Sequence, residues 1–304
     1  MYLLRYYTID DRQTFCTDFR KPLKAGRVWP YPDTVRILWL IIAVYGLVVL
    51  AAWLLQYRML YFPERLSPDG LRRRAAAADL TLWAQEGGDY RGLLREPAGD
   101  CRGTVLVFHG NAGAAVDRSY YADALVPLDY RVILVEYPAY GGRPGRLGEA
   151  GFTADARGAV DLTRAQFGAP LFLWGESLGC GVAAAAVSDA VRGLVLLTPW
   201  DSLTNLARSL YRFLPIGLLL RDRYDTLARL AGYPGPVAVI MAGRDKVIPN
   251  RFTKNLYESL ASRKRMWVFK DAGHNSWPSD PGLAWWREVM AFVDTPDSPT
   301  PAEK

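Results

Sequence analysis

Ser177 lies in a sequence pattern that is typical of a nucleophile in acyl-transfer chemistry. The run GESLG at residues 175–179 matches Gly-x-Ser-x-Gly, follows an apolar run and opens an alanine-rich one. A serine in this pattern sits on a sharp turn between a strand and a helix. Gly175 and Gly179 are expected to flank the turn because a side chain there would clash with the neighbouring elements. We therefore predict that Ser177 is a nucleophilic serine.

Two further side chains complete the set that such a serine requires. His274 follows the last predicted strand, and its imidazole is placed to take the serine proton and return it to a leaving group. Asp245 follows the preceding predicted strand and is expected to orient that imidazole, which gives the chain order Ser, Asp, His. Asp201 and Asp225 are alternative acids. The simpler interpretation of His274 is a surface or packed histidine, and that of Asp245 is a solvated carboxylate in a turn.

A loop of small residues is expected to bind the negative charge that develops on the reacting oxygen. The run HGNAG at residues 109–113 follows a predicted strand, and its small residues allow backbone N–H groups to approach a substrate. We predict the N–H groups of Asn111 and Leu178 as the two donors. His109 is expected to hydrogen-bond within this loop and, with Gly110, to support the turn.

Other candidate motifs have simpler interpretations. Cys180 is expected to be a small buried side chain, and the glycine-rich stretch 141–151 lacks the Gly-Lys-Ser/Thr of a phosphate loop. The chain has three widely separated cysteines and two histidines, which disfavours a zinc site and a disulfide framework. The predicted chemistry requires no metal and no organic cofactor. A net charge of +6 without a Lys/Arg block gives no indication of nucleic-acid binding.

Eight short runs rich in Val, Leu and aromatic residues are expected to form the sheet that positions these side chains. The first two flank Gly87-Gly88 as in an antiparallel hairpin, and the later ones are almost continuously apolar, as in strands buried on both faces. Helical stretches between the later runs predict a mostly parallel sheet with helices on both faces. The runs are Asp79–Ala84, Tyr90–Arg95, Thr104–Phe108, Arg131–Glu136, Leu171–Trp174, Gly193–Leu197, Val237–Met241 and Arg265–Phe269.

An apolar segment precedes this sheet. Residues 37–55 read ILWLIIAVYGLVVLAAWLL, without a charge, and about 20 apolar residues span a bilayer as a helix. The run has no polar stripe, as a buried core helix would, and it is too long and begins too late for a cleaved signal peptide. We predict one retained transmembrane helix, in the cell (inner) membrane. Lys and Arg are balanced on its two sides, so the membrane face of the catalytic domain is left open.

The domain organisation follows from these segments. Residues 1–36 form a polar and aromatic leader, residues 56–78 a connector and residues 79–293 one catalytic domain. A short lid is expected at 201–236, between the sixth and seventh strands, where apolar residues would suit an acyl chain or ordinary helix packing. The Pro-rich tail at 294–304 is expected to be disordered.

Together the motifs resemble the α/β-hydrolase superfamily, and more narrowly its small membrane-anchored members. That group includes protein depalmitoylases, lysophospholipid lipases and serine aminopeptidase-like hydrolases. The resemblance covers about residues 58–290 and implies the α/β-hydrolase fold, with Ser177 as nucleophile, Asp245 as acid, His274 as base, and Asn111 and Leu178 as oxyanion donors. The motifs on which the resemblance rests are LYFP at 60–63, FHGNAG at 108–113, EYPAYG at 136–141, GESLG at 175–179, TPWDS at 198–202, GRDKVIP at 243–249 and GHN at 273–275.

The resemblance has two departures, both in one loop. Relatives usually have a serine where Arg143 stands, and often Pro-Ser-Glu where this chain has Leu147-Gly148-Glu149, which leaves the loop's substrate contacts open. The expected function is hydrolysis of acyl esters or thioesters of lipid-like or lipidated substrates, with membrane lipid as the environment. A serine peptidase with the same residues and a catalytically idle membrane scaffold are the alternatives. The oligomeric state is not predicted.

Overall fold

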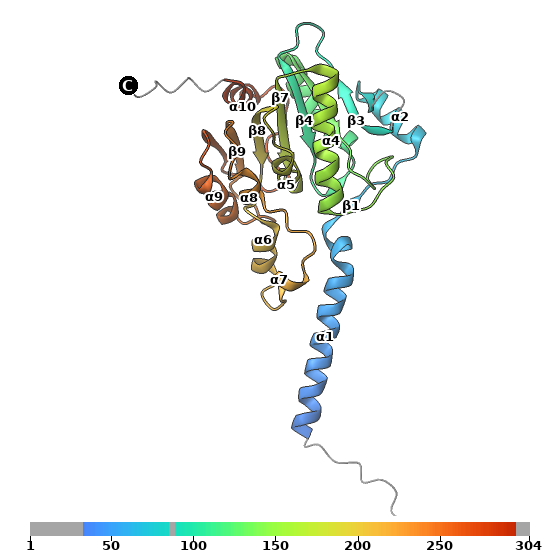
Figure 1. Ribbon diagram of the computed structural model, residues 1–304, viewed down its shortest axis with the longest axis vertical. Coiled ribbons are helices and arrows are strands. Elements are labelled where there is room, and N and C mark those ends of the chain that lie inside the picture. Colours follow the sequence, from blue (N-terminus) through green and yellow to red (C-terminus); the bar gives the residue numbers. More distant parts are fainter. Residues whose placement is uncertain (1–32, 85–88, 296–304) are drawn as a thin grey trace, which may run out of the picture. The chain divides into compact units, whose positions relative to one another are not determined.

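A computed structural model describes residues 33–84 and 89–295 of the chain (Figure 1). The chain divides into two compact units, Met1–Leu47 and Val48–Lys304. The predicted leader up to residue 32 and the tail from residue 296 lie outside the described residues, as does the Gly87-Gly88 turn.

Helix α1 (Asp33–Leu60) contains the predicted transmembrane segment and extends beyond it at both ends. It is long and apolar enough to cross a membrane, with a mean hydropathy of 2.6 over its most apolar window, and none of its residues is buried. The sequence placed residues 56–78 in a connector. Residues 56–60 continue the helix, because Gln56 and Tyr57 pack against the catalytic domain rather than entering solvent as a linker would.

The central sheet has eight strands in the order β10-β9-β8-β7-β4-β6-β3-β2. The pairs β2–β3 and β3–β6 are antiparallel, and all the other pairs are parallel. Each strand lies within two residues of its predicted bounds, which confirms the eight-stranded, mostly parallel sheet. The strands are β2 (Thr81–Ala84), β3 (Tyr90–Arg95), β4 (Gly103–Phe108), β6 (Tyr130–Val135), β7 (Leu171–Glu176), β8 (Val191–Leu197), β9 (Val237–Ala242) and β10 (Lys264–Phe269).

Helices cover both faces of the sheet, as predicted, and each face has its own apolar core. Phe152 and Val182 pack with Leu106 on one face, and Tyr121 and Trp286 pack with strand residues on the other. The first face carries α4 (Glu149–Phe167), α5 (Leu178–Ala185) and α9 (Asn250–Ser259), and the second carries α2 (Pro68–Ala77), α3 (Ser119–Leu125) and α10 (Ala284–Asp294). Short 3-10 turns η1 (Ala115–Arg118) and η2 (Val126–Leu128) flank α3.

Two small features lie near the site: the β1–β5 pair, which was not predicted from the sequence, and the lid helices, which were predicted only as a region. Strand β1 (Phe62–Pro63) pairs in parallel with β5 (Ala112–Gly113), so the chain leaving α1 is bonded to the predicted oxyanion loop. The predicted lid region lies between β8 and β9 and forms α6 (Leu203–Leu210), α7 (Ile216–Leu219) and α8 (Thr226–Leu230).

Candidate active site

Ser177 stands between the end of β7 and the start of α5, with φ of 54° and ψ of −113°. A positive φ is rare for a residue with a side chain, so this turn is strained and must be held by its surroundings. The flanking glycines make that possible. A Cβ at Gly179 would lie 1.9 Å from the Phe108 carbonyl oxygen, and one at Gly175 would lie 2.5 Å from the Cα of Cys180. The close packing of backbone on backbone therefore requires glycine at both positions.

The structure brings the predicted serine, histidine and aspartate together. His274 Nε2 lies 3.0 Å from Ser177 Oγ, and His274 Nδ1 lies 2.7 Å from Asp245 Oδ2. The other carboxylate oxygen, Asp245 Oδ1, accepts hydrogen bonds from the N–H groups of Val247 and Ile248, each at 2.8 Å. Because the carboxylate can only accept here, Nδ1 carries the proton and the lone pair of Nε2 faces the serine hydroxyl. This is the arrangement in which an imidazole can remove a proton from Ser177.

The two alternative acids are engaged elsewhere. Asp225 caps α8, with its side chain accepting a hydrogen bond from the Ala228 N–H at 3.0 Å. Asp201 accepts hydrogen bonds from the side-chain amides of Asn205 at 3.2 Å and Asn255 at 2.6 Å. Both carboxylates serve the local structure of the lid, which leaves Asp245 as the acid in contact with His274.

The predicted oxyanion loop is fixed by the end of α1, by the residues that follow it and by Tyr140. The Asn111 side chain donates to the Leu60 carbonyl at 2.8 Å, and the Asn111 carbonyl accepts from the Phe62 N–H at 2.9 Å and the Tyr140 hydroxyl at 2.7 Å. Leu178 is the first residue of α5, where N–H groups have no acceptor within the helix. Asn111 and Leu178 line the same cavity as Ser177, so their backbone groups border the predicted reaction centre.

His109 is buried behind this loop. Its Nδ1 donates to the Gly110 carbonyl at 2.7 Å, and its ring packs against Tyr137 with 4.3 Å between ring centroids. Its Nε2 lies 3.4 Å from the fully buried carboxylate of Glu136, which also accepts from the Ala115 N–H at 3.2 Å. The contacts of His109 therefore stabilise the loop.

Glu176, the residue before the serine, holds a second polar cluster. Its carboxylate accepts hydrogen bonds from Tyr120 at 2.9 Å, Tyr121 at 3.0 Å and Arg118 at 3.2 Å. Burial raises the pKa of both tyrosine hydroxyls, and the nearby carboxylate raises it further. Cys180 is fully buried, and burial raises the pKa of its thiol well above the usual range, so this cysteine stays protonated and unreactive.

The loop that departs from the resemblance has structural contacts in this chain. Arg143 forms a two-point ion pair with Asp155 of α4, at 2.6 and 2.8 Å, and also donates to the Glu136 carbonyl at 2.6 Å. Further along, Glu149 accepts a hydrogen bond from the Arg223 N–H at 2.6 Å. These contacts join the loop to α4 and to the lid, and they give Arg143 a role in holding the loop.

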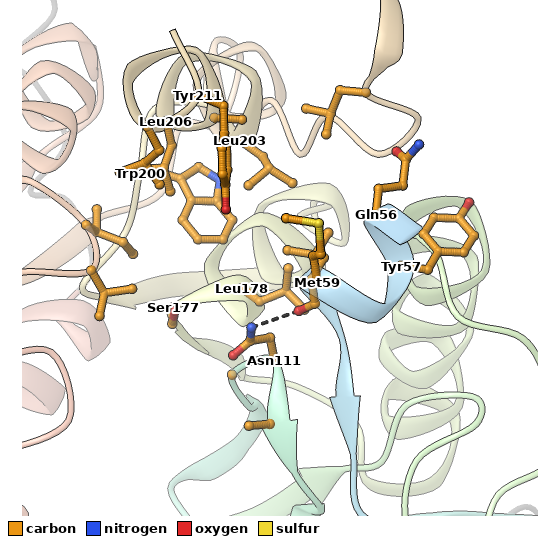
Figure 2. A pocket seen from close by; sticks show the side chains of 18 of the residues that line it. Gln56, Tyr57, Met59, Asn111, Ser177, Leu178, Trp200, Leu203, Leu206 and Tyr211 are labelled. Atoms are coloured by element: carbon orange, nitrogen blue, oxygen red, sulfur yellow. Dashed lines mark hydrogen bonds between the residues drawn. The ribbon is translucent and has the colours of Figure 1, made fainter. Parts of the chain in front are cut away.

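A cavity of about 370 Å³ opens above Ser177 (Figure 2). Its lid side is mostly apolar, and Figure 2 shows Trp200, Leu203, Leu206 and Tyr211 there. Its other wall was not predicted from the sequence, because it comes from the end of α1. The residues of that wall are Ala52, Gln56, Tyr57, Met59 and Leu60. A signal was present in the sequence, since the polar Gln56 ends the apolar run and these residues recur at the three- and four-residue spacing of one helix face.

Comparison with known proteins identifies the family. A family model described as the alpha/beta hydrolase fold matches residues 103–232. The uncharacterized protein Rv2307c of Mycobacterium tuberculosis is 36% identical over 234 residues, which are 75% of this chain and 83% of that protein. The chain belongs to the α/β-hydrolase family.

Other proteins similar to this hydrolase include esterases and lipases. The lysophosphatidylserine lipase ABHD12 of Danio rerio is 30% identical over 184 residues, which are 53% of this chain and 48% of that lipase. The chain thus spans about half the length of that relative. The Pyrococcus furiosus esterase Pf2001 shares 16% identity at a TM-score of 0.59, covering 77% of this chain and 96% of the esterase. The monoacylglycerol lipase of Paleococcus ferrophilus shares 20% identity at a TM-score of 0.50, covering 66% and 97%. At these identities the two structures share the fold.

Proposed function

We propose that this α/β-hydrolase is a membrane-anchored serine esterase or lipase that cleaves acyl esters or thioesters through an acyl-Ser177 intermediate. One observation carries the proposal. The Ser177 hydroxyl lies 3.0 Å from His274 Nε2, whose ring is held by Asp245, at the floor of an apolar cavity. A nucleophile, a base and an orienting acid within hydrogen-bond distance are the parts that acyl transfer requires.

The reaction follows from this geometry. His274 takes the proton of Ser177 Oγ as that oxygen attacks the carbonyl carbon of the acyl group. The carbonyl oxygen becomes negative and is stabilised by the N–H groups of Asn111 and Leu178, while Asp245 stabilises the imidazolium. His274 then gives its proton to the leaving oxygen or sulfur. Water attacks the acyl-serine in the same way and releases the acid, with Ser177 restored.

The substrate class follows from the cavity and from α1. The cavity is bounded by leucines and aromatic side chains from the lid, which suit a hydrocarbon chain and give an amide backbone few partners. A helix with the length and hydropathy of α1 holds the active site beside a bilayer, where single-chain lipids are concentrated. The names of the relatives, a lysophosphatidylserine lipase and a monoacylglycerol lipase, support the same class. We therefore propose lipid-like esters or thioesters with one acyl chain.

The test is labelling of the full chain in detergent micelles with a fluorophosphonate probe. We expect the parent to label, Ser177→Ala to fail to label, and the exposed Ser188→Ala to label like the parent. Turnover of monoacylglycerols, lysophospholipids and acyl thioesters is expected to fall by a factor on the order of 10⁶ in Ser177→Ala. Equal labelling of Ser177→Ala and the parent would refute the proposed nucleophile. Turnover of aminoacyl amides alone would refute the lipid substrate.

A further inference from the structure

The end of α1 is a wall of the active-site cavity. Ala52, Gln56, Met59 and Leu60 line the cavity together with Ser177. Their spacing of four, three and one residues places them on one face of the helix. All four belong to the compact unit that begins at Val48 and includes the catalytic domain. The same helix that is proposed to cross the membrane therefore also faces the substrate.

This wall has a near end and a far end relative to the reaction centre. Leu60 is at the near end, because its carbonyl accepts a 2.8 Å hydrogen bond from Asn111 of the predicted oxyanion loop. Figure 2 shows Ser177, Asn111 and Leu178 close together beneath Met59. Ala52 lies eight residues before Leu60, which is about 12 Å along a helix axis. Among the α1 residues that line the cavity, Ala52 is the one farthest along the helix from the loop.

The lid is fastened to the same stretch of α1. The Gln56 side chain accepts a hydrogen bond from the Arg221 N–H at 2.9 Å and donates to the Leu219 carbonyl at 3.3 Å. The Arg221 guanidinium lies over the Trp53 ring, 4.0 Å from its centroid. These contacts hold the lid against α1 beside the cavity.

We propose that the acyl chain lies along this face of α1 and that Ala52 sets the longest chain accepted. This inference rests on the proposed esterase function and names a specificity residue for it. Ala52 has the smallest side chain of the five α1 residues that line the cavity, so it leaves space where the end of a long chain would lie. It also belongs to the apolar stretch 48–55 of α1, which gives a lipid tail an apolar path along the helix toward Ser177.

The experiment compares Ala52→Phe with Ala51→Phe in the full chain in detergent micelles. Ala51 has the same side chain one position earlier, and it is not among the residues that line the cavity. A one-residue step turns the helix by about 100°. The substrates are butyryl and palmitoyl p-nitrophenyl esters, and the active site is monitored by the rate of fluorophosphonate labelling.

We expect Ala52→Phe to lower kcat/KM for the palmitoyl ester at least about tenfold, since a hydrophobic pocket discriminates by that much over small changes in size. Its butyryl turnover falls by a smaller factor than its palmitoyl turnover, and Ala51→Phe keeps the parental chain-length profile and labelling rate. Equal profiles for the two labelled variants would overturn the inference and leave the esterase function standing. If Ala52→Phe fails to label, the smaller Ala52→Val takes its place, and an unchanged chain-length profile in that variant overturns the inference. A parent that does not label would instead overturn the proposed function.

Discussion

Replacing Gln56 tests whether α1 holds the lid. The Gln56 side-chain amide links α1 to the lid by two hydrogen bonds. It accepts one from the Arg221 N–H at 2.9 Å and donates one to the Leu219 carbonyl at 3.3 Å. Gln56→Met keeps the length of the side chain and removes both bonds to the lid, together with a 2.8 Å bond from Gln56 to the Trp53 carbonyl within α1. The Arg221 guanidinium remains over Trp53 in this variant, so the lid loses part of its attachment and the fold is retained.

The size of the effect follows from the two bonds. A hydrogen bond between neutral groups contributes about 0.5–1.5 kcal/mol net. The 3.3 Å bond is long, so its share is at the low end of that range. The lid should therefore open more easily by about 1–2 kcal/mol, which raises the population of the open state roughly 5- to 30-fold.

Amide hydrogen exchange of the full chain measures this opening. Peptides covering residues 216–224 should exchange roughly 5- to 30-fold faster in Gln56→Met than in the parent. Gln166→Met is the matched control, because Gln166 also makes two bonds between elements, accepting from Trp83 Nε1 at 2.8 Å and donating to the Ala84 carbonyl at 3.2 Å. That variant should leave exchange of the lid unchanged. Parental exchange at 216–224 in Gln56→Met would show that Gln56 does not hold the lid.

Three further substitutions test the turn at Ser177 and the carboxyl groups of Asp222 and Asp294. Gly179→Ala should lower the unfolding temperature sharply or prevent folding, because its Cβ would lie 1.9 Å from a backbone oxygen. Gly99→Ala is the control, because a Cβ there meets open space, and it should change the free energy of unfolding by less than about 0.5 kcal/mol. Burial raises the pKa of Asp222 despite a hydrogen bond from Tyr61, so its ionisation opposes folding and Asp222→Asn should gain thermal stability relative to the parent as pH rises above about 4. Burial alone would raise the pKa of Asp294, but its tyrosine and arginine partners lower it. Asp294→Asn should therefore lose stability at neutral pH and approach the parent as pH falls below about 4, and parallel pH curves in unfolding scans would contradict both assignments.

The sheet was predictable because its strands are buried on both faces. Continuous apolar runs mark such strands, and β4 and β7 were found within two residues of their bounds. The turn at Ser177 was also predictable, since its close backbone contacts leave glycine as the residue that fits at positions 175 and 179. Local rules of this kind can be read from a few neighbouring residues.

The wall formed by α1 could not be predicted in the same way. Hydropathy assigns an apolar residue such as Ala52 to lipid, and only the folded chain brings that face beside Ser177. The contacts that place it join Gln56 to Arg221, 165 positions away, and no local pattern encodes that pairing. The choice among Asp201, Asp225 and Asp245 likewise depended on which carboxylates are engaged by nearby amides and helix termini.

The pairing of β1 with β5 limits how this protein can be taken apart or recombined. The end of α1 and the residues after it hold the loop at Asn111, through the Leu60 carbonyl, which accepts from the Asn111 side chain, and the Phe62 N–H, which donates to the Asn111 carbonyl. A shortened version for biochemistry would therefore have to keep the stretch from Val48 onward, with detergent to cover its exposed apolar side chains. For the same reason, exchanging α1 for another hydrophobic helix during evolution would alter the active-site cavity and the loop at Asn111. The last turns of α1 and the catalytic domain are therefore expected to be inherited as one unit.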